Sequence, residues 1–324
     1  MVDLLRRQLG KNHSEMSSEK RHGRDVIVDG IKQAQVPLEY KANLLGLIWQ
    51  QDGPRGVLSV GGNIREVEYD PIWRSALRSV SPEVLLDKWQ RFEVFAHSRN
   101  RVRIIRCSDT SYRFERHTVD GNIPTDPENF LICGLLIALL EKIGCQALKC
   151  HMKTVASTEL DCTEFCLRKN SDFILPEDLE RLNTAEWVIT WKEFVAQADP
   201  EKDELEAYKN TLLRPYGSDE NPSLEKALGL LVRDVARTWK VEDLAHDAGL
   251  SKRSLQRKLK EIDLSFSHLV RMVRINEACR LLKEGKGEIT TIGFCCGFSD
   301  SAHFSRDFRA SMGMTPTYYR ELSR

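Results

Sequence analysis

The sequence predicts a multidomain protein: an α+β N-terminal domain, then an all-α C-terminal domain with two helix-turn-helix subdomains joined by a long helix. Three observations lead to this prediction. At 324 residues the chain exceeds what one small hydrophobic core usually serves. Strand-like and helical patterns alternate up to about residue 200. From residue 222 onward the pattern is helical throughout.

Composition is that of a globular protein, with 41% hydrophobic and 30% charged residues. The first residues, MVDLLRRQLGKNHSEMSSEKRHGRD, contain one short apolar cluster interrupted by Arg6, Arg7 and Gly10, which is not the pattern of a secretion signal. The nine cysteines are scattered along the chain. We therefore expect reduced thiols and a cytoplasmic location.

The most apolar segment, NFLICGLLIALLEKIGC from Asn129, predicts a buried helix. Its unbroken apolar run is far shorter than the roughly 20 residues needed to cross a bilayer, so no membrane association is expected. We place Asp126 at its N-cap, Pro127 at its first helical position and Gly144 at its end.

Composition shifts divide the chain into four segments. Residues 1–24 are polar and predicted to be mobile, and residues 25–200 are predicted to form the α+β domain. Residues 201–221 are highly charged and contain Pro215 and Gly217, which favours a linker. Residues 222–324 form the predicted all-α domain.

Local patterns assign elements within the α+β domain. The segments RFEVFAHS, RVRIIRC and SYRFERHTV alternate apolar and polar side chains, which predicts strands, and Asp120-Gly121 predicts a turn. The segment SPEVLLDKWQRF predicts a helix with Ser81 as its cap and Pro82 as its first residue.

The net charge of zero conceals an uneven distribution. From Pro222 onward, 18 Lys and Arg stand against 13 Asp and Glu, which leaves 30 against 35 in the rest of the chain. The C-terminal third is therefore the basic part, as a nucleic-acid partner requires.

The first predicted helix pair lies in VEDLAHDAGLSKRSLQRKLKE. Gly249 permits the positive φ that ends one helix, and Ser251 can cap the next. With Leu255 and Leu259 facing inward, the second helix exposes a face suited to phosphates and to base edges in a major groove. That face consists of Lys252, Arg253, Gln256, Arg257 and Lys260.

The second pair, EITTIGFCCGFSDSAHFSRDFRASMG, repeats this construction. Gly297 is placed at the turn and Ser299 at the cap, while Phe304 and Phe308 face inward. The exposed face of its second helix is predicted to carry Ser301, Ala302, Ser305, Arg306 and Arg309. Cys295 and Cys296 are ordinary helix positions in this interpretation, because a metal site would need further ligands nearby.

A long helix in SFSHLVRMVRINEACRLLKEG joins the two pairs. Its roughly 18 residues span about 27 Å. That length approaches the ~34 Å turn of B-DNA, which suits two recognition helices in successive major grooves. We predict an apolar stripe along it that comprises Phe266, Leu269, Val270, Val273, Ala278, Leu281 and Leu282.

The segments DLAHDAGLSKRSLQRKLK, RINEACRLL, GFSDSAHFSRDF and TPTYYR occur in the order and spacing of the DNA-binding domain of AraC/XylS transcription regulators, which the last 100 or so residues resemble. The resemblance implies a seven-helix unit that binds double-stranded promoter DNA and acts through RNA polymerase. It also implies an N-terminal domain for effector binding or dimerisation, so a small-molecule effector and a homodimer are expected. Asp263 and Gly293 depart from the pattern, which commonly has Gly and Ala there; Gly293 should weaken its helix by up to about 1 kcal/mol.

Other functions are less well supported by the sequence. Adaptive alkylation-repair proteins resemble this family, but their methyl-accepting Pro-Cys-His-Arg motif is absent, and Cys150-His151 follows Lys149. No phosphate loop or hydrolase motif occurs either. We expect no enzyme activity and no cofactor, and control of a regulator by a protein partner remains open.

Cysteine, histidine and tryptophan side chains in the N-terminal part have two interpretations. The segments CQALKCH and DCTEFC could hold zinc or a redox switch, but their spacings are looser than those of zinc knuckles, which favours buried or semi-exposed thiols and no metal. The histidines could be ligands or pH sensors, and the tryptophans could line an effector pocket, although structural roles are commoner. These residues are His97, His117, His151, Trp49, Trp73, Trp89, Trp187 and Trp191.

Overall fold

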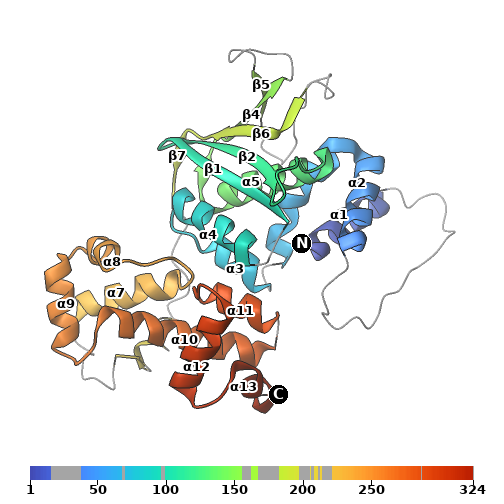
Figure 1. Ribbon diagram of the computed structural model, residues 1–324. Coiled ribbons are helices and arrows are strands. Elements are labelled where there is room, and N and C mark those ends of the chain that lie inside the picture. Colours follow the sequence, from blue (N-terminus) through green and yellow to red (C-terminus); the bar gives the residue numbers. More distant parts are fainter. Residues whose placement is uncertain are drawn as a thin grey trace. The chain divides into compact units, whose positions relative to one another are not determined.

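The computed structural model describes residues 1–15, 38–67, 70–95, 99–154, 162–166, 182–196, 205, 208–210, 212–213, 221–285 and 287–323. The chain forms two compact units. Figure 1 shows the chain coloured from its N-terminus (blue) to its C-terminus (red). The first contains Met1–Tyr69 and Trp89–Ala196, and the second contains Asp70–Lys88 and Gln197–Arg324. Thus residues 70–88, which the sequence assigns to the N-terminal domain, belong to the same unit as the C-terminal helices. None of the described helices is long and apolar enough to cross a membrane.

A five-stranded antiparallel sheet organises the first unit. Its strand order is β1-β2-β6-β4-β5. The strands are β1 (Asn100–Ser108), β2 (Ser111–Thr118), β4 (Lys149–Thr154), β5 (Cys162–Cys166) and β6 (Leu182–Thr190). Two short strands, β3 (Cys145–Gln146) and β7 (Glu193–Phe194), pair separately. The sheet and its helices confirm the α+β prediction, including the strands predicted in RVRIIRC and SYRFERHTV.

Aromatic pairs hold the buried side of the sheet. Phe114 on β2 stacks on Trp187 of β6 with ring centroids 5.9 Å apart, and Tyr112 stacks on Trp191 at 5.7 Å. All four side chains are buried. These tryptophans therefore pack in the core, as their commoner interpretation predicts.

Helix α5 (Asp126–Ile143) is the predicted buried helix, and every residue from Asn129 to Leu140 is buried. Gly144 ends it, as predicted. The predicted N-cap was wrong by one residue: Thr125 is the N-cap, and its N–H donates to Glu128 Oε2 at 3.0 Å. Asp126 instead accepts a hydrogen bond from the Thr184 hydroxyl on β6.

Three N-terminal elements pack around α5 and one another: α1 (Val2–Glu15), α2 (Leu38–Ser59) and the 3-10 helix η1 (Val60–Val67). Leu4 and Leu5 of α1 are fully buried. The prediction of a mobile start was therefore wrong for the first 15 residues, because two leucines provide enough apolar surface to dock this helix. Residues 16–24 of that predicted segment lie outside the described part.

Helix α4 (Pro82–Phe95) confirms the helix predicted in SPEVLLDKWQRF, and Ser81 Oγ accepts from the Val84 N–H at 3.3 Å. The strand predicted in RFEVFAHS was wrong, because residues 91–95 continue the helix. Helical spacing lets Trp89 Nε1 donate to Glu93 Oε1 at 3.1 Å, and Glu93 Oε2 also accepts from the Val102 N–H at 2.7 Å. These contacts stabilise the helix, although apolar and polar residues alternate here as they do in a strand.

The second unit contains α3 (Pro71–Leu77) and the first part of α4. Its described C-terminal residues form α7 (Pro222–Arg233), α8 (Val241–Ala248), α9 (Lys252–Lys260), α10 (Phe266–Glu284), α11 (Ile289–Cys295), α12 (Ser301–Met312) and α13 (Pro316–Leu322). Helix α10 has 19 residues, about 28 Å. Phe266 is only partly buried, but Ile275, Glu277 and Cys279 are buried beside the predicted stripe. Burial thus extends around more of α10 than one stripe.

The segment predicted to be a charged linker contributes to the core of the second unit. Tyr208, Leu212 and Leu213 are buried in the cluster built by α7, α8, α9 and α10. Tyr208 Oη donates to the buried carboxylate of Glu277 at 2.9 Å. For these described residues the linker prediction was wrong, because the charged composition around them hid three buried side chains.

The close approach of α5 to α2 supplies a test of packing in the first unit. A Cβ at Gly134 would lie 2.2 Å from the Leu58 carbonyl oxygen, whereas a Cβ at Gly46 of α2 would meet nothing within 4 Å. We expect Gly134→Ala to lower the free energy of unfolding by about 1–3 kcal/mol or more through overpacking. Gly46→Ala, the control, should be neutral or stabilising by up to about 1 kcal/mol. Urea unfolding followed by tryptophan fluorescence measures both, and equal effects would contradict the close approach.

Candidate nucleic-acid interface

Helices α8 and α9 form a tight pair whose turn follows the sequence prediction. Gly249 adopts the left-handed conformation at φ 75°, and its N–H bonds back to α8. Ser251 Oγ accepts from the Ser254 N–H at 3.1 Å and so begins α9. Leu255 and Leu259 are fully buried. Their burial fixes which face of α9 remains outside.

The outside face of α9 is basic and polar. All five predicted residues are exposed: Lys252, Arg253, Gln256, Arg257 and Lys260. Two of them lie beside acids, since Lys252 Nζ is 2.6 Å from Glu242 Oε1 and Arg257 Nε is 3.7 Å from Glu261 Oε1. The hydrogen bond from Lys252 lowers the pKa of Glu242. Exposed pairs of this kind contribute little net energy, so both cations can exchange an acid for a phosphate.

Helices α11 and α12 repeat the construction with one difference. Gly297 adopts a left-handed φ of 80°, as predicted for the turn. The N-cap of α12 is Asp300, so the prediction of Ser299 was wrong by one residue. Asp300 Oδ1 accepts from the His303 N–H at 2.7 Å, which lowers the pKa of Asp300. Ser299 Oγ lies instead 3.0 Å from His303 Nδ1.

The outside face of α12 largely matches the predicted set. Ser301, Ala302, Arg306 and Arg309 are exposed, while Ser305 is only half-exposed. Phe304 and Phe308 are fully buried, and their rings meet edge-on at 5.7 Å. The structure therefore places the small residues Ser301 and Ala302, at the start of α12, on one exposed surface with Arg306 and Arg309.

Two residues that depart from the family pattern have structural explanations. Asp263 takes a left-handed φ of 54°, which is the conformation that the commoner glycine would adopt without strain. A Cβ at Gly293 would lie 2.8 Å from the Phe304 ring. Gly293 therefore permits α11 and α12 to approach closely, which is a use for glycine that helix propensity alone does not show.

A charge network that sequence reasoning missed connects α12 to α10. Asp307 Oδ2 lies 3.5 Å from Arg271 Nε and 3.4 Å from His303 Nε2. These three residues line a groove of about 240 Å³ together with Trp239, Phe266, Ser267, Val270, Arg274 and Phe298. The helical spacing of His303 and Asp307 could be read from the sequence, but their partner on α10 could not. These contacts connect α12 to the joining helix α10.

Most of the described cysteines are buried thiols, whereas Cys107 is exposed. Burial raises the pKa of Cys295 and of Cys296, and raises the pKa of Cys145 to about 12, which disfavours the thiolate that binds metals. Cys133 Sγ and Cys150 Sγ lie 3.6 Å apart and share a hydrogen bond, and both are free thiols. Within the described residues no three His, Cys, Asp or Glu side chains gather as metal ligands do. The side chains of Cys162 and Cys166 lie outside the described part.

The remaining candidate residues of the N-terminal part are dispersed. His117 is exposed on β2, His151 is half-buried on β4, and His97 lies outside the described residues. Trp49 lies 5.9 Å from Phe130, ring to ring, while Trp73 is buried on α3 in the second unit. The structure does not gather these side chains into one site.

Comparison with known proteins agrees with this geometry. Residues 244–322 match the family model described as a helix-turn-helix domain. The chain is 32% identical over 92 residues to the transcriptional regulator SirC of Salmonella typhimurium, covering 28% of this chain and 31% of SirC. It is 31% identical over 111 residues to the transcriptional activator RhaR of Klebsiella pneumoniae, covering 34% and 40%. The chain thus spans about a third of the length of the first curated relatives it matches, and these are regulators rather than enzymes.

A solved structure matches the same region. A transcriptional regulator with an AraC-type DNA-binding domain from Chromobacterium violaceum is 31% identical, with a TM-score of 0.31. The match covers 32% of this chain and 92% of that one.

Gly297 provides a test of how closely the turn of the second helix pair packs against its neighbours. A Cβ there would lie 2.7 Å from the Val235 carbonyl oxygen and 3.0 Å from Arg274 Nε, whereas Gly313 has a similar φ of 74° and nothing within 4 Å. Gly313→Ala should lower the free energy of unfolding by about 1–2 kcal/mol, solely because alanine is strained in the left-handed conformation. We expect Gly297→Ala to lower the free energy of unfolding by about 1–3 kcal/mol more than Gly313→Ala does, because its added Cβ also overpacks against the neighbouring atoms. Urea unfolding followed by circular dichroism measures both, and equal losses would rule out a role for the close approach.

Proposed function

We propose, from the premise that the C-terminal region is an AraC-type helix-turn-helix domain, that this protein is a sequence-specific DNA-binding transcriptional regulator. In this proposal α9 and α12 enter successive major grooves of promoter DNA. The first unit controls when they do so. The family match covers the C-terminal region, and the whole protein's activity and partners are part of the proposal.

One observation carries the proposal: the same construction occurs twice, on either side of a 19-residue helix. Each pair has a left-handed glycine in its turn, at Gly249 and Gly297, and a polar cap on its second helix. Each second helix buries two apolar side chains and exposes cationic and polar ones. Many single helix pairs never contact DNA, but a repeated pair with a basic outer face suits a bipartite site.

Roles for individual side chains follow from their chemistry. We assign phosphate contacts to Lys252, Arg257, Lys260 and Arg309, since cations there release counterions and make affinity depend on salt. We assign base-edge contacts to Arg253, Gln256, Ser301 and Arg306, whose donors and acceptors can read a major groove. Ala302 suits apolar contact with a thymine methyl group, and Ser305 lies at the margin of this surface.

Partners other than DNA follow from the family resemblance. A regulator of this type acts through RNA polymerase, and its first unit binds a small-molecule effector or a second copy of the chain. The first unit suits such a role because it has a sheet and a buried helix of its own, separate from the helices assigned to DNA. No cofactor is required by the proposed activity.

A protein partner is the second candidate for the controlling signal. Val119 and Ile123, close together on the segment after β2, are 67% and 70% exposed. Exposed apolar side chains favour contact with another protein where they form one contiguous patch. An effector would instead occupy an apolar cavity, so binding assays with each kind of partner discriminate between them.

Substitutions on the two exposed faces should have different signatures. Arg306→Ala should weaken binding by about 1–3 kcal/mol and relax base preference at one position, because a base-edge contact is lost. Lys260→Ala should weaken binding to all sequences and reduce the slope of log K against log salt by about 1, because one phosphate contact is lost. Fluorescence anisotropy at several salt concentrations measures both effects. Lys226→Ala, an exposed lysine on α7, is the control and should change neither.

Selection from a randomised DNA library tests the proposal as a whole. The full chain, at fixed salt, should enrich a bipartite site whose halves lie about one helical turn apart. Repeating the selection with residues 220–324 shows whether the rest of the chain changes recognition. Failure of both proteins to enrich any sequence would reject the assignment as a DNA-reading regulator.

A further inference from the structure

Residues 70–88 pack against the C-terminal helices, within the second unit. We call this stretch the bracing segment; it comprises α3, the turn that follows it and the first half of α4. Asp70 caps α3 by accepting from the Ile72 N–H at 2.9 Å. The segment comes from a distant part of the sequence, so its contacts are not required by chain connectivity.

A buried ion pair fastens the bracing segment to the first helix pair. Lys88 Nζ lies 2.5 Å from Asp234 Oδ1, with the two side chains only 4% and 1% exposed. The same ammonium donates to the Ser75 carbonyl oxygen at 2.8 Å, which closes the turn between α3 and α4. Asp234 ends α7, and its carbonyl oxygen accepts from Trp239 Nε1 at 2.9 Å. The carboxylate therefore sits at the connection that positions α8.

A second set of contacts joins the bracing segment to the other helix pair. Helix α3 packs against α11, and its Trp73 is buried. Arg74 Nη1 lies 3.5 Å from Glu284 Oε2 at the end of α10. Pro71 lies beside Gly287, where an added Cβ would be 3.5 Å from the proline ring. One segment thus contacts the connection before α8 and the start of the α11–α12 pair.

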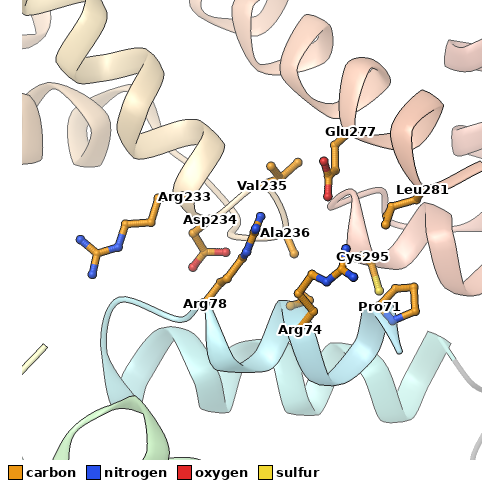
Figure 2. A pocket seen from close by; sticks show the side chains of 11 residues that line it. Pro71, Arg74, Arg78, Arg233, Asp234, Val235, Ala236, Glu277, Leu281 and Cys295 are labelled. Carbon is orange, nitrogen blue, oxygen red and sulfur yellow. The ribbon is translucent and has the colours of Figure 1, made fainter. Parts of the chain in front are cut away.

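Figure 2 shows the remaining space between these elements. Arg74 and Arg78 extend from the bracing segment toward Asp234, Glu277 and Cys295, which belong to three different elements. The cavity that they surround holds only about 20 Å³, room for roughly one water molecule. The fit is therefore too close for a ligand and has the character of an internal packing surface.

We propose that the bracing segment fixes the orientation of the α8–α9 pair relative to the α11–α12 pair, and so sets the half-site spacing that the protein accepts. This inference rests on the proposed function, since spacing has meaning only for a bipartite DNA site. Lys88 is the positioning residue, because its charge is compensated at the point where the segment meets the first pair. Loss of either partner breaks this buried ion pair, which favours undocking.

Hydrogen exchange of the full chain tests the docking itself. In the wild-type protein the amides of α3 should be protected together with those of α11. Lys88→Met and Asp234→Asn should each accelerate exchange of α3 by about tenfold or more, as undocking exposes it. The double variant Lys88→Met/Asp234→Leu replaces the pair by apolar side chains and should restore protection. The control Arg99→Met removes an exposed pair with Asp120 in the first unit and should change nothing in α3.

Spacing selectivity tests the consequence for DNA. For each protein we would measure Kd for the selected site and for the same site with one base pair added between its halves. The wild type should discriminate strongly, and each single variant should lose about tenfold of that discrimination, a magnitude typical of coupling between sites. The double variant should recover it.

The outcomes separate the two proposals. Unprotected α3 amides in the wild type, or exchange unchanged by both single variants, would overturn the docking. A uniform rise of Kd for both spacings would show that the segment only stabilises the unit, and would overturn the proposed control of spacing. Absence of sequence-selective DNA binding by the wild type would defeat the proposed function and the spacing inference with it, while the exchange data would still decide whether the segment is docked.

Discussion

The second unit depends on one constraint: α10 belongs to two hydrophobic cores at once. Leu269, Val270 and Val273 in its first half complete the core formed with α7, α8 and α9. Its second half packs against α11 and α13 and buries Leu281 and Leu282 there. A helix that serves two cores cannot rotate to improve one without opening the other. The two helix pairs that carry the exposed faces of α9 and α12 therefore share this one helix.

Local signals in the sequence were sufficient for most of this unit. A left-handed glycine, a polar cap and buried positions three or four residues apart are properties of a few consecutive residues, so Gly249, Ser251 and Gly297 could be predicted. The error at Ser299 has the same origin. Ser299 and Asp300 can both cap a helix, and only the three-dimensional position of the His303 N–H decides between them.

Long-range contacts could not be predicted, and they account for the larger errors. Residues 91–95 alternate apolar and polar side chains as a strand does. Glu93, however, accepts hydrogen bonds from Trp89 and Val102 and pairs with Arg116, which stabilises the helix here. Burial raises the pKa of Glu93. Tyr208 lies in a charged segment, yet Glu277 gives its hydroxyl a buried partner. Each case involves a buried polar group with a partner that local patterns do not reveal, Arg116 for Glu93 and Glu277 for Tyr208. Such partners must be present because an unpaired buried polar group is costly.

The proposed control of DNA reading by the first unit requires an element whose position both units constrain, since a ligand can shift only an equilibrium between states that it binds differently. Helix α4 is common to both units by covalent continuity. Its Lys88 is held by Asp234 in the second unit, and its Glu93 is paired with buried Arg116 in the first. Buried charged residues in the middle of this helix and near its end make its displacement costly. Glu93 and Lys88 therefore lie on one continuous helix, the first paired within the first unit and the second within the second unit.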